Sequence, residues 1–174
     1  MKLRLAAALV LALAAGVEAA ECPLDETIYR QPGNDWVLKF VPVPRDAPVN
    51  QVSAFQIMSP GDPALLMEGG IYTPNGFGRP LGVITLPCGD GAAEADENTW
   101  CEPFWEGPVY ALVDGGIDVF PWDPDLPRDR QVTPAQVLLP GFASSVWYSM
   151  LRDTAWDDDP FGDVFTFRRC LGDE

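Results

Sequence analysis

Carboxylates are the side chains of this sequence whose spacing points most directly to chemistry. Five aspartates lie between positions 153 and 163. Ca²⁺ requires oxygen ligands at alternating positions, so the sequence predicts Asp157, Asp159 and Asp163 as ligands of this ion. An EF-hand loop does not fit, because Phe161 stands at a ligand position and Arg168 stands where a bidentate glutamate belongs. The alternative is a solvated acidic loop and a protein without any cofactor.

Two further groups of acids stand beside aromatic rings. One group surrounds Trp122 and has the same ambiguity between a metal site and a solvated loop: Asp118, Asp123, Asp125 and Asp129. The other consists of Glu102 and Glu106, close in sequence to Trp100, Phe104 and Trp105. Because glycosidases cleave with a pair of carboxylates, this pair suggests a carboxylate-dependent glycoside hydrolase. The same rings equally fit a hydrophobic core.

Histidine is absent from the sequence. A Ser–His or Cys–His nucleophile, an imidazole ligand for zinc or copper, and an ordinary proton shuttle near neutral pH are therefore excluded. A lysine-assisted serine would depend on Lys39, which lies inside a predicted strand. Whether the protein is an enzyme stays open, and these absences favour a protein that is not one.

The amino end has the order of a signal peptide. Lys2 and Arg4 precede an apolar run from Leu5 to Ala15, and small residues follow. The run is too short for a permanent membrane anchor. Cleavage after Ala19 predicts a signal peptide at 1–19, a mature domain at 20–174, and a periplasmic or secreted location.

The charge of the chain restricts its partners. The formal net charge is −15, and it becomes −16 without residues 1–19, which carry two cations and one acid. Such a field repels phosphate backbones and anionic lipids, so nucleic acids and membrane surfaces are poor partners. A basic extracytoplasmic protein is the partner that the charge favours, and the alternative is that the acidity serves only to keep the protein soluble.

The four cysteines form an even set in an oxidising compartment, which predicts two disulfides. Cys88 and Cys101 flank one acidic loop, so their pairing leaves Cys22 to bond with Cys170. Two other connectivities remain possible. No Cys-x-x-Cys motif is present that would indicate redox exchange, haem attachment or zinc.

Most segments of the sequence that could position these acidic and aromatic residues have the pattern of β-strands. Short apolar runs end at Gly, Pro or Asn, and they lie at 36–43, 51–58, 65–67, 71–73, 81–86, 109–113, 117–120 and 164–168. Tight hairpins are expected at Glu68-Gly69-Gly70 and at Asp114-Gly115-Gly116. Segments 133–138 and 143–152 are helix candidates, and the second fits a strand as well.

This pattern predicts one mainly β domain, an antiparallel sandwich or barrel of about eight to ten short strands with at most two short helices. Loops on a rigid scaffold commonly carry function. The leading hypothesis is therefore an exported binding or interaction protein that acts through its acidic, aromatic-bearing loops at 89–100, 121–131 and 153–163. A calcium-stabilised carbohydrate-binding module and a carboxylate-dependent glycoside hydrolase are the alternatives.

Overall fold

The computed structural model describes residues 22–59, 66–74, 78–86, 103–113, 116–121, 123, 125–127, 131–149, 151–152 and 162–173. Its elements are a 3₁₀ turn η1 (Leu24–Glu26), β1 (Thr27–Arg30), β2 (Val37–Val41), β3 (Gln51–Met58), β4 (Leu66–Tyr72), β5 (Leu81–Thr85), β6 (Trp105–Pro108), β7 (Tyr110–Val113), β8 (Gly116–Val119), β9 (Gln136–Leu138), α1 (Phe142–Trp147) and β10 (Val164–Cys170). The prediction of a mainly β protein is confirmed, with ten strands and one short α-helix in this described part.

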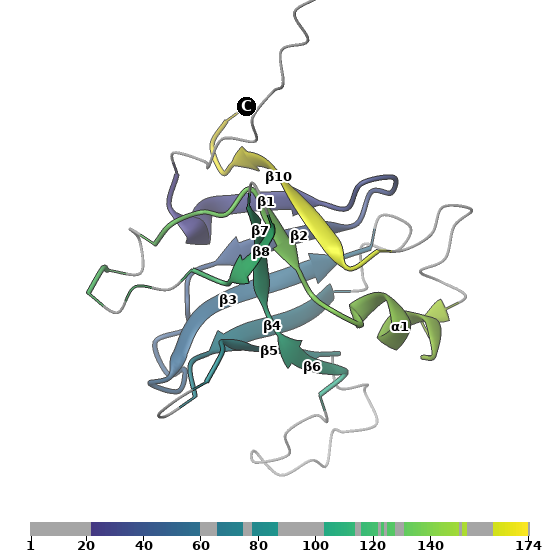
Figure 1. Ribbon diagram of the computed structural model, residues 1–174, viewed down its shortest axis with the longest axis horizontal. Coiled ribbons are helices and arrows are strands. Elements are labelled where there is room, and N and C mark those ends of the chain that lie inside the picture. The colour runs from purple at the N-terminus through teal and green to yellow at the C-terminus, as the bar shows by residue number, and fades with distance from the viewer. Residues whose placement is uncertain are drawn as a thin grey trace, which may run out of the picture.

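The strands form one curled sheet, a half-barrel in which every pairing is antiparallel (Figure 1). Their order across the sheet is β6-β5-β4-β3-β2-β1-β10-β9-β7-β8. Strands β1 to β6 follow one another as simple neighbours, whereas β10 inserts between β1 and β9. The end of the chain is thereby built into the middle of the sheet.

The sheet curls because one short segment contributes to both of its ends. Strand β6 pairs with β5 at one edge, and β7 pairs with β9 and β8 near the other edge. Val109 alone separates β6 from β7. Its N–H donates to the carbonyl of Pro80 at 3.2 Å, and its carbonyl accepts from the N–H of Phe120 at 3.2 Å. Val109 is fully buried where the two ends of the sheet come together.

The inside of the curl is filled with side chains. Its largest fully buried rings are those of Trp36, Tyr29, Phe40, Phe55, Phe120, Phe142 and Phe165. The Phe40 ring lies 5.7 Å from that of Tyr29 and 5.9 Å from those of Phe55 and Phe120, between ring centroids. Rings packed at such distances stabilise a core beyond the apolar area that they bury. The interior of the described sheet is therefore a packed core.

One expected hairpin is wrong. Glu68, Gly69 and Gly70 form no turn but lie within the continuous strand β4, which pairs with β3 and β5. Gly69 stands opposite Phe55, and a Cβ atom at Gly69 would overlap the Phe55 ring. The glycine is therefore used for close packing rather than for a turn. The other expected hairpin is confirmed, since Val113 pairs with Gly116 across the β7–β8 turn.

The two helix candidates have opposite outcomes. Segment 133–138 is not helical, because Val137 in β9 pairs with Ala111 on one side and with Phe165 on the other. Segment 143–152 is helical in its first half, because α1 runs from Phe142 to Trp147. In segment 133–138, a threonine and a proline at the start indicate a helix, but pairing with β7 and β10 makes part of this segment a strand.

One disulfide is described. Cys22 is bonded to Cys170, as the sequence predicts, and it joins the start of the described chain to the end of β10. Cys88 and Cys101 lie outside the described residues, so their bond stays a prediction. Residues 1–19 also lie outside them, and the signal peptide and the single mature domain stay predictions too. Within the described part of the chain, no helix is long and apolar enough to cross a membrane.

Candidate functional site

Asp163 caps the helix α1. Its carboxylate accepts hydrogen bonds from the N–H groups of Gly141 at 2.8 Å and Ala143 at 2.7 Å. Its carbonyl accepts from the N–H of Leu139 at 2.9 Å. A carboxylate at this place satisfies N–H groups that a helix leaves without partners, and it complements the helix dipole. Asp163 therefore has a structural function whether or not it also binds a metal ion.

The remaining predicted calcium ligands, Asp157 and Asp159, lie outside the described residues. Among the residues that are described, no group of three or more His, Cys, Asp or Glu side chains could hold a metal ion. Calcium binding by Asp157, Asp159 and Asp163 stays a prediction.

Trp105 belongs to the hydrophobic core, which is one of the two places that the sequence allows for it. Its ring is 4% exposed and packs against Gly82 and Gly107, which face each other in β5 and β6. Its indole N–H donates to the carbonyl of Pro140 at 3.1 Å. Glu106 is exposed on β6, and its proposed partner Glu102 lies outside the described residues. The structure thus removes Trp105 as a stacking ring beside this carboxylate pair.

The buried side chain of Gln131 bonds to the described residues of the acidic loop after β8. This amide accepts from the N–H of Asp123 at 2.9 Å and donates to the carbonyls of Asp123 at 2.8 Å and Leu126 at 2.9 Å. The Asp123 carboxylate also accepts from the N–H of Asp125 at 2.9 Å. A buried amide that uses both its donor and its acceptor holds Asp123 and Leu126 in place. Asp123 and Asp125 are both exposed.

Beside this loop, a groove of about 270 Å³ separates the β7–β8 hairpin from the segment 132–136. It is lined by Ala111, Leu112, Val113, Asp118, Val119, Pro121, Val132, Thr133, Pro134, Ala135 and Gln136. Tyr29 fixes one wall, because its hydroxyl donates to the carbonyl of Pro134 at 2.8 Å. Burial raises the pKa of the Tyr29 hydroxyl, so it stays a donor over a wide pH range.

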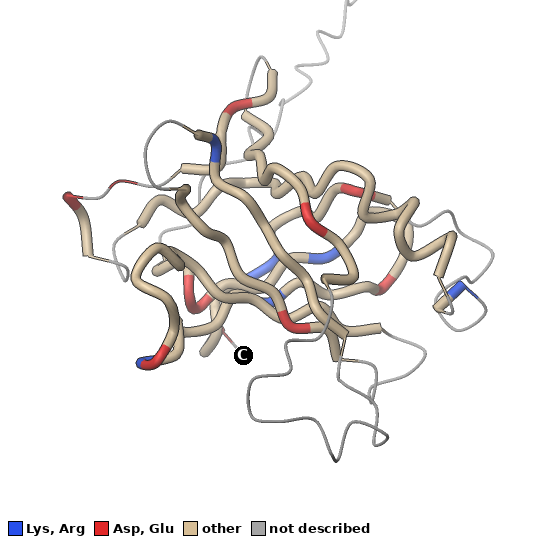
Figure 2. The backbone as a smooth tube through the Cα atoms, turned by 90° about the horizontal axis from the view of Figure 1, so that it is seen from below, with Lys and Arg blue, Asp and Glu red and all other residues tan. Residues whose placement is uncertain are grey.

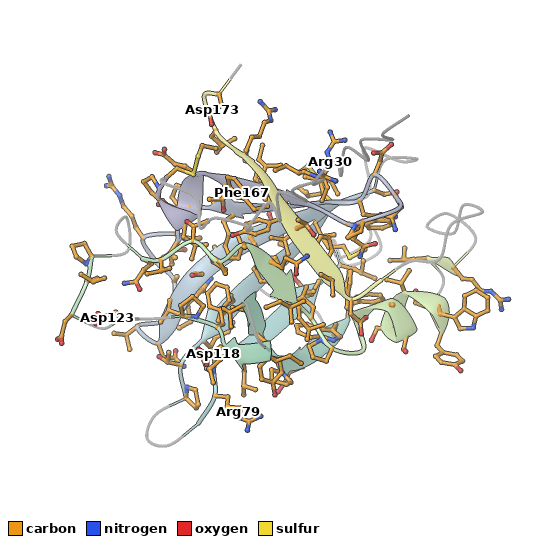
Figure 3. All side chains as sticks on the ribbon, turned by 45° about the horizontal axis from the view of Figure 1, so that its top comes forward. Arg30, Arg79, Asp118, Asp123, Phe167 and Asp173 are labelled. Atoms are coloured by element: carbon orange, nitrogen blue, oxygen red, sulfur yellow. A yellow bond between two sulfur atoms is a disulfide. The ribbon has the colours of Figure 1, made fainter. Side chains whose placement is uncertain are left out.

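The strand β8 forms one edge of the sheet, and all four of its residues are exposed. Apolar side chains at or near this edge face solvent: Ile117 is 63% exposed, Val132 55% and Val113 51%. Asp118 lies between Ile117 and Val119 on the same strand and lines the groove. Figure 3 shows Asp118 and Asp123 on one side of the molecule, away from Arg30. We call β8, the groove and Asp118, Asp123 and Asp125 the β8 surface.

The sequence pointed to part of this surface only. It predicts the β7–β8 hairpin and indicates Asp118, Asp123 and Asp125 as candidate site residues. For Ile117 to Phe120 it predicts a strand, without indicating that this strand lies at an edge of the sheet. That β8 is an edge strand follows from its place in the sheet. An apolar strand interrupted by a single aspartate was the available signal, since charges on a strand are a common protection of a sheet edge.

No family model matches the chain, and comparisons with curated proteins and with solved structures likewise find no match.

Proposed function

We propose that this protein is an exported binding protein that recognises a partner protein through the β8 surface. The observation that carries the proposal is the combination of an exposed edge strand, solvent-facing apolar side chains and a neighbouring groove. An edge strand offers unpaired N–H and C=O groups that an extended segment of another protein can complete. The groove would hold side chains of that segment.

The charges around β8 favour a basic segment as the occupant. The stretch 114–131 carries five acids and two arginines, so its formal charge is −3. Asp118 lines the groove, while Asp123 and Asp125 are exposed in the acidic loop that follows β8. Complementary charge increases the rate of association and disfavours acidic competitors.

Hydrogen bonds in the rest of the described structure favour a rigid scaffold, which suits a binding protein. Every buried side-chain nitrogen or oxygen among the described residues has a hydrogen-bond partner. Gln31, for example, donates to the Gly162 carbonyl, and Thr133 donates to that of Cys22 at 2.8 Å. These buried polar groups connect distant segments of the chain, and their hydrogen bonds hold the surface residues in place. The Cys22–Cys170 disulfide supports an extracytoplasmic location.

Site-specific photocrosslinking tests this proposal. The mature protein carries a photoreactive amino acid at position 117 or, as a control, at position 148, where Tyr148 is 86% exposed outside the β8 surface. Each form is irradiated at low salt in an extract of extracytoplasmic proteins from its own cells. We expect a defined adduct from position 117 that is absent from position 148. Equal adducts from both positions, or none from position 117, would refute the proposal.

A pair of aspartate variants gives the second arm. Ile117→Asp places an additional acid in the middle of the edge strand, whereas Val49→Asp makes the same chemical change at a residue that is 95% exposed on another loop. Because position 117 is now mutated, the photoreactive amino acid is placed at position 119. We expect Ile117→Asp to abolish the adduct formed from position 119 and Val49→Asp to leave this adduct unchanged. Equal effects of both variants would show that the contact is not made through β8.

A further inference from the structure

A second groove, of about 650 Å³, lies on the outer face of β1, β2 and β10. It is lined by Ile28, Arg30, Gln31, Gly33, Asn34, Asp35, Val37, Arg168 and Arg169. Three arginines thus converge in one place, although the whole chain has only 11 lysines and arginines and a formal charge of −15. We call this place the arginine groove.

A β-bulge brings two of these arginines to the same face. Ile28 in β1 pairs with Arg169 in β10, but the next residue, Tyr29, pairs with Phe167, so Arg168 has no partner in β1. In a regular strand, neighbouring side chains point to opposite faces. At this bulge both Arg168 and Arg169 are exposed, while Phe167 is partly buried against the core.

The register of the strands places two further cations, Arg30 and Lys39, on the same outer face. Arg30 lies two residues after Ile28 and therefore on the same face of β1. Lys39 in β2 stands directly opposite Ile28 on the side away from Arg169. Figure 2 shows blue segments of neighbouring strands close together near the middle of the view, with red segments more widely spread. Four cations from three adjacent strands thus share one region of the outer face.

Acidic groups neutralise only part of this charge. Arg30 forms an exposed ion pair with Asp35 at 3.3 Å. Arg169 donates to the main-chain carbonyl of Asp173 at 3.0 Å, and the Asp173 carboxylate accepts from the N–H of Cys170 at 3.3 Å. The side chain of Arg168 has no hydrogen-bond or ion-pair partner among the described residues. An anion in the groove can therefore accept hydrogen bonds from the Arg168 guanidinium.

We propose that the arginine groove binds a small organic anion that carries two or more carboxylate or phosphate groups. Guanidinium groups match both of these anions with paired N–H donors. Ile28 and Val37 supply an apolar floor for a carbon skeleton, and the volume lies in the range of small-molecule sites, roughly 300–1,000 Å³. The net negative charge of the protein does not prevent this, because at physiological salt an ion responds mainly to charges within about 8 Å.

This site is independent of the proposed partner surface. Figure 3 shows Arg30 at the opposite side of the molecule from Asp118 and Asp123. The two proposals can therefore succeed or fail separately.

Calorimetric titration of the mature protein at low ionic strength tests the site with two probes, citrate for carboxylates and pyrophosphate for phosphates. We expect saturable binding of at least one probe at one site per chain. Arg168→Gln should weaken it about tenfold, as expected for the loss of a charged hydrogen bond. Arg168→Lys should weaken it less, since it keeps the charge and loses the paired donors. Binding of citrate alone or of pyrophosphate alone assigns the ligand class.

Arg45→Gln is the matched control, because Arg45 is exposed and does not line the groove. We expect it to leave the affinity within about twofold of the unchanged protein. The melting temperature of each variant is measured alongside, and amide chemical shifts of the unchanged protein show whether Ile28 and Asn34 respond to the probe. No binding of either probe at about 10 mM, or an equal loss in Arg45→Gln and Arg168→Gln, overturns the proposal.

Discussion

The Asp163 carboxylate accepts a 2.7 Å hydrogen bond from the main-chain N–H of Ala143, 20 residues earlier in the chain. Together with the bond from Gly141, it fastens the start of α1 to the start of β10. The carboxylate thus stabilises a contact between two elements as well as a helix end.

Replacement of Asp163 should lower the free energy of unfolding. Asp163→Ala leaves the N–H groups of Gly141 and Ala143 without their acceptor, at a cost of about 1–2 kcal/mol. Asp163→Asn keeps one acceptor oxygen and should cost less. Urea unfolding measures both, with Asp46→Ala as an exposed control. A cost for Asp163→Ala no larger than for Asp46→Ala would contradict the capping function.

Calcium binding can be tested without disturbing this cap. If Asp157, Asp159 and Asp163 hold Ca²⁺, adding the ion to chelator-treated protein raises the melting temperature, because the ion binds the folded state. Asp157→Asn and Asp159→Asn should then remove the rise. Asp163 is unsuitable for substitution here, because its carboxylate already caps α1. The absence of a shift at millimolar calcium would exclude the site.

The disulfide should contribute strongly to stability. Cys22 and Cys170 are 148 residues apart, and closing so long a loop stabilises a protein by about 4–5 kcal/mol in the entropy model. Cys22→Ser combined with Cys170→Ser should therefore cost more than Cys88→Ser combined with Cys101→Ser, whose predicted loop is much shorter. Peptide mapping of the non-reduced protein should show both pairs. A bond between Cys88 and any other partner would refute the predicted connectivity.

Stability should fall in alkaline solution because of Tyr29. Its pKa is raised by burial, so above about pH 10 the unfolded chain loses this proton while the folded protein keeps it. The contribution is complete below about pH 10 and then decreases by up to about 1.4 kcal/mol per pH unit. Tyr29→Phe should reduce this slope, whereas Tyr148→Phe, at an exposed position, should not. Urea unfolding between about pH 9 and 11 measures the slope, and equal slopes in all three proteins would contradict the prediction.

Gly69 should be intolerant of a larger side chain. The added methyl group of Gly69→Ala would overlap the ring of Phe55, which is fully buried and packed against Phe40, so we expect a loss of about 1–3 kcal/mol. Gly162→Ala is the control, because its nearest neighbour beyond the adjoining residues is the Val164 nitrogen at 3.9 Å. In a double-mutant cycle, Phe55→Leu should partly restore the stability that Gly69→Ala removes. Additive losses would show that the two residues are not coupled.

Local patterns predicted the strands whose signals were strong. Gln51–Met58 is an apolar run bounded by a proline and coincides with β3, and the Asp-Gly-Gly sequence marks the β7–β8 turn. The short strand β6 was missed because Glu106, Gly107 and Pro108 have poor strand propensity. Its pairing with β5 depends on the Trp105 ring packed over Gly82 and Gly107, which no local window contains.

The sequence by itself determined the fold class and the exclusion of histidine-dependent chemistry, because alternation and composition are local or global properties of the chain. It favoured a bond between Cys22 and Cys170 among three connectivities, and the structure selected that pair. Only the tertiary structure decided that Asp163 caps α1, that β8 is an edge and that Arg30, Arg168 and Arg169 converge. Each of these depends on strand order, on register or on a bulge, and these are set by packing between segments far apart in the sequence.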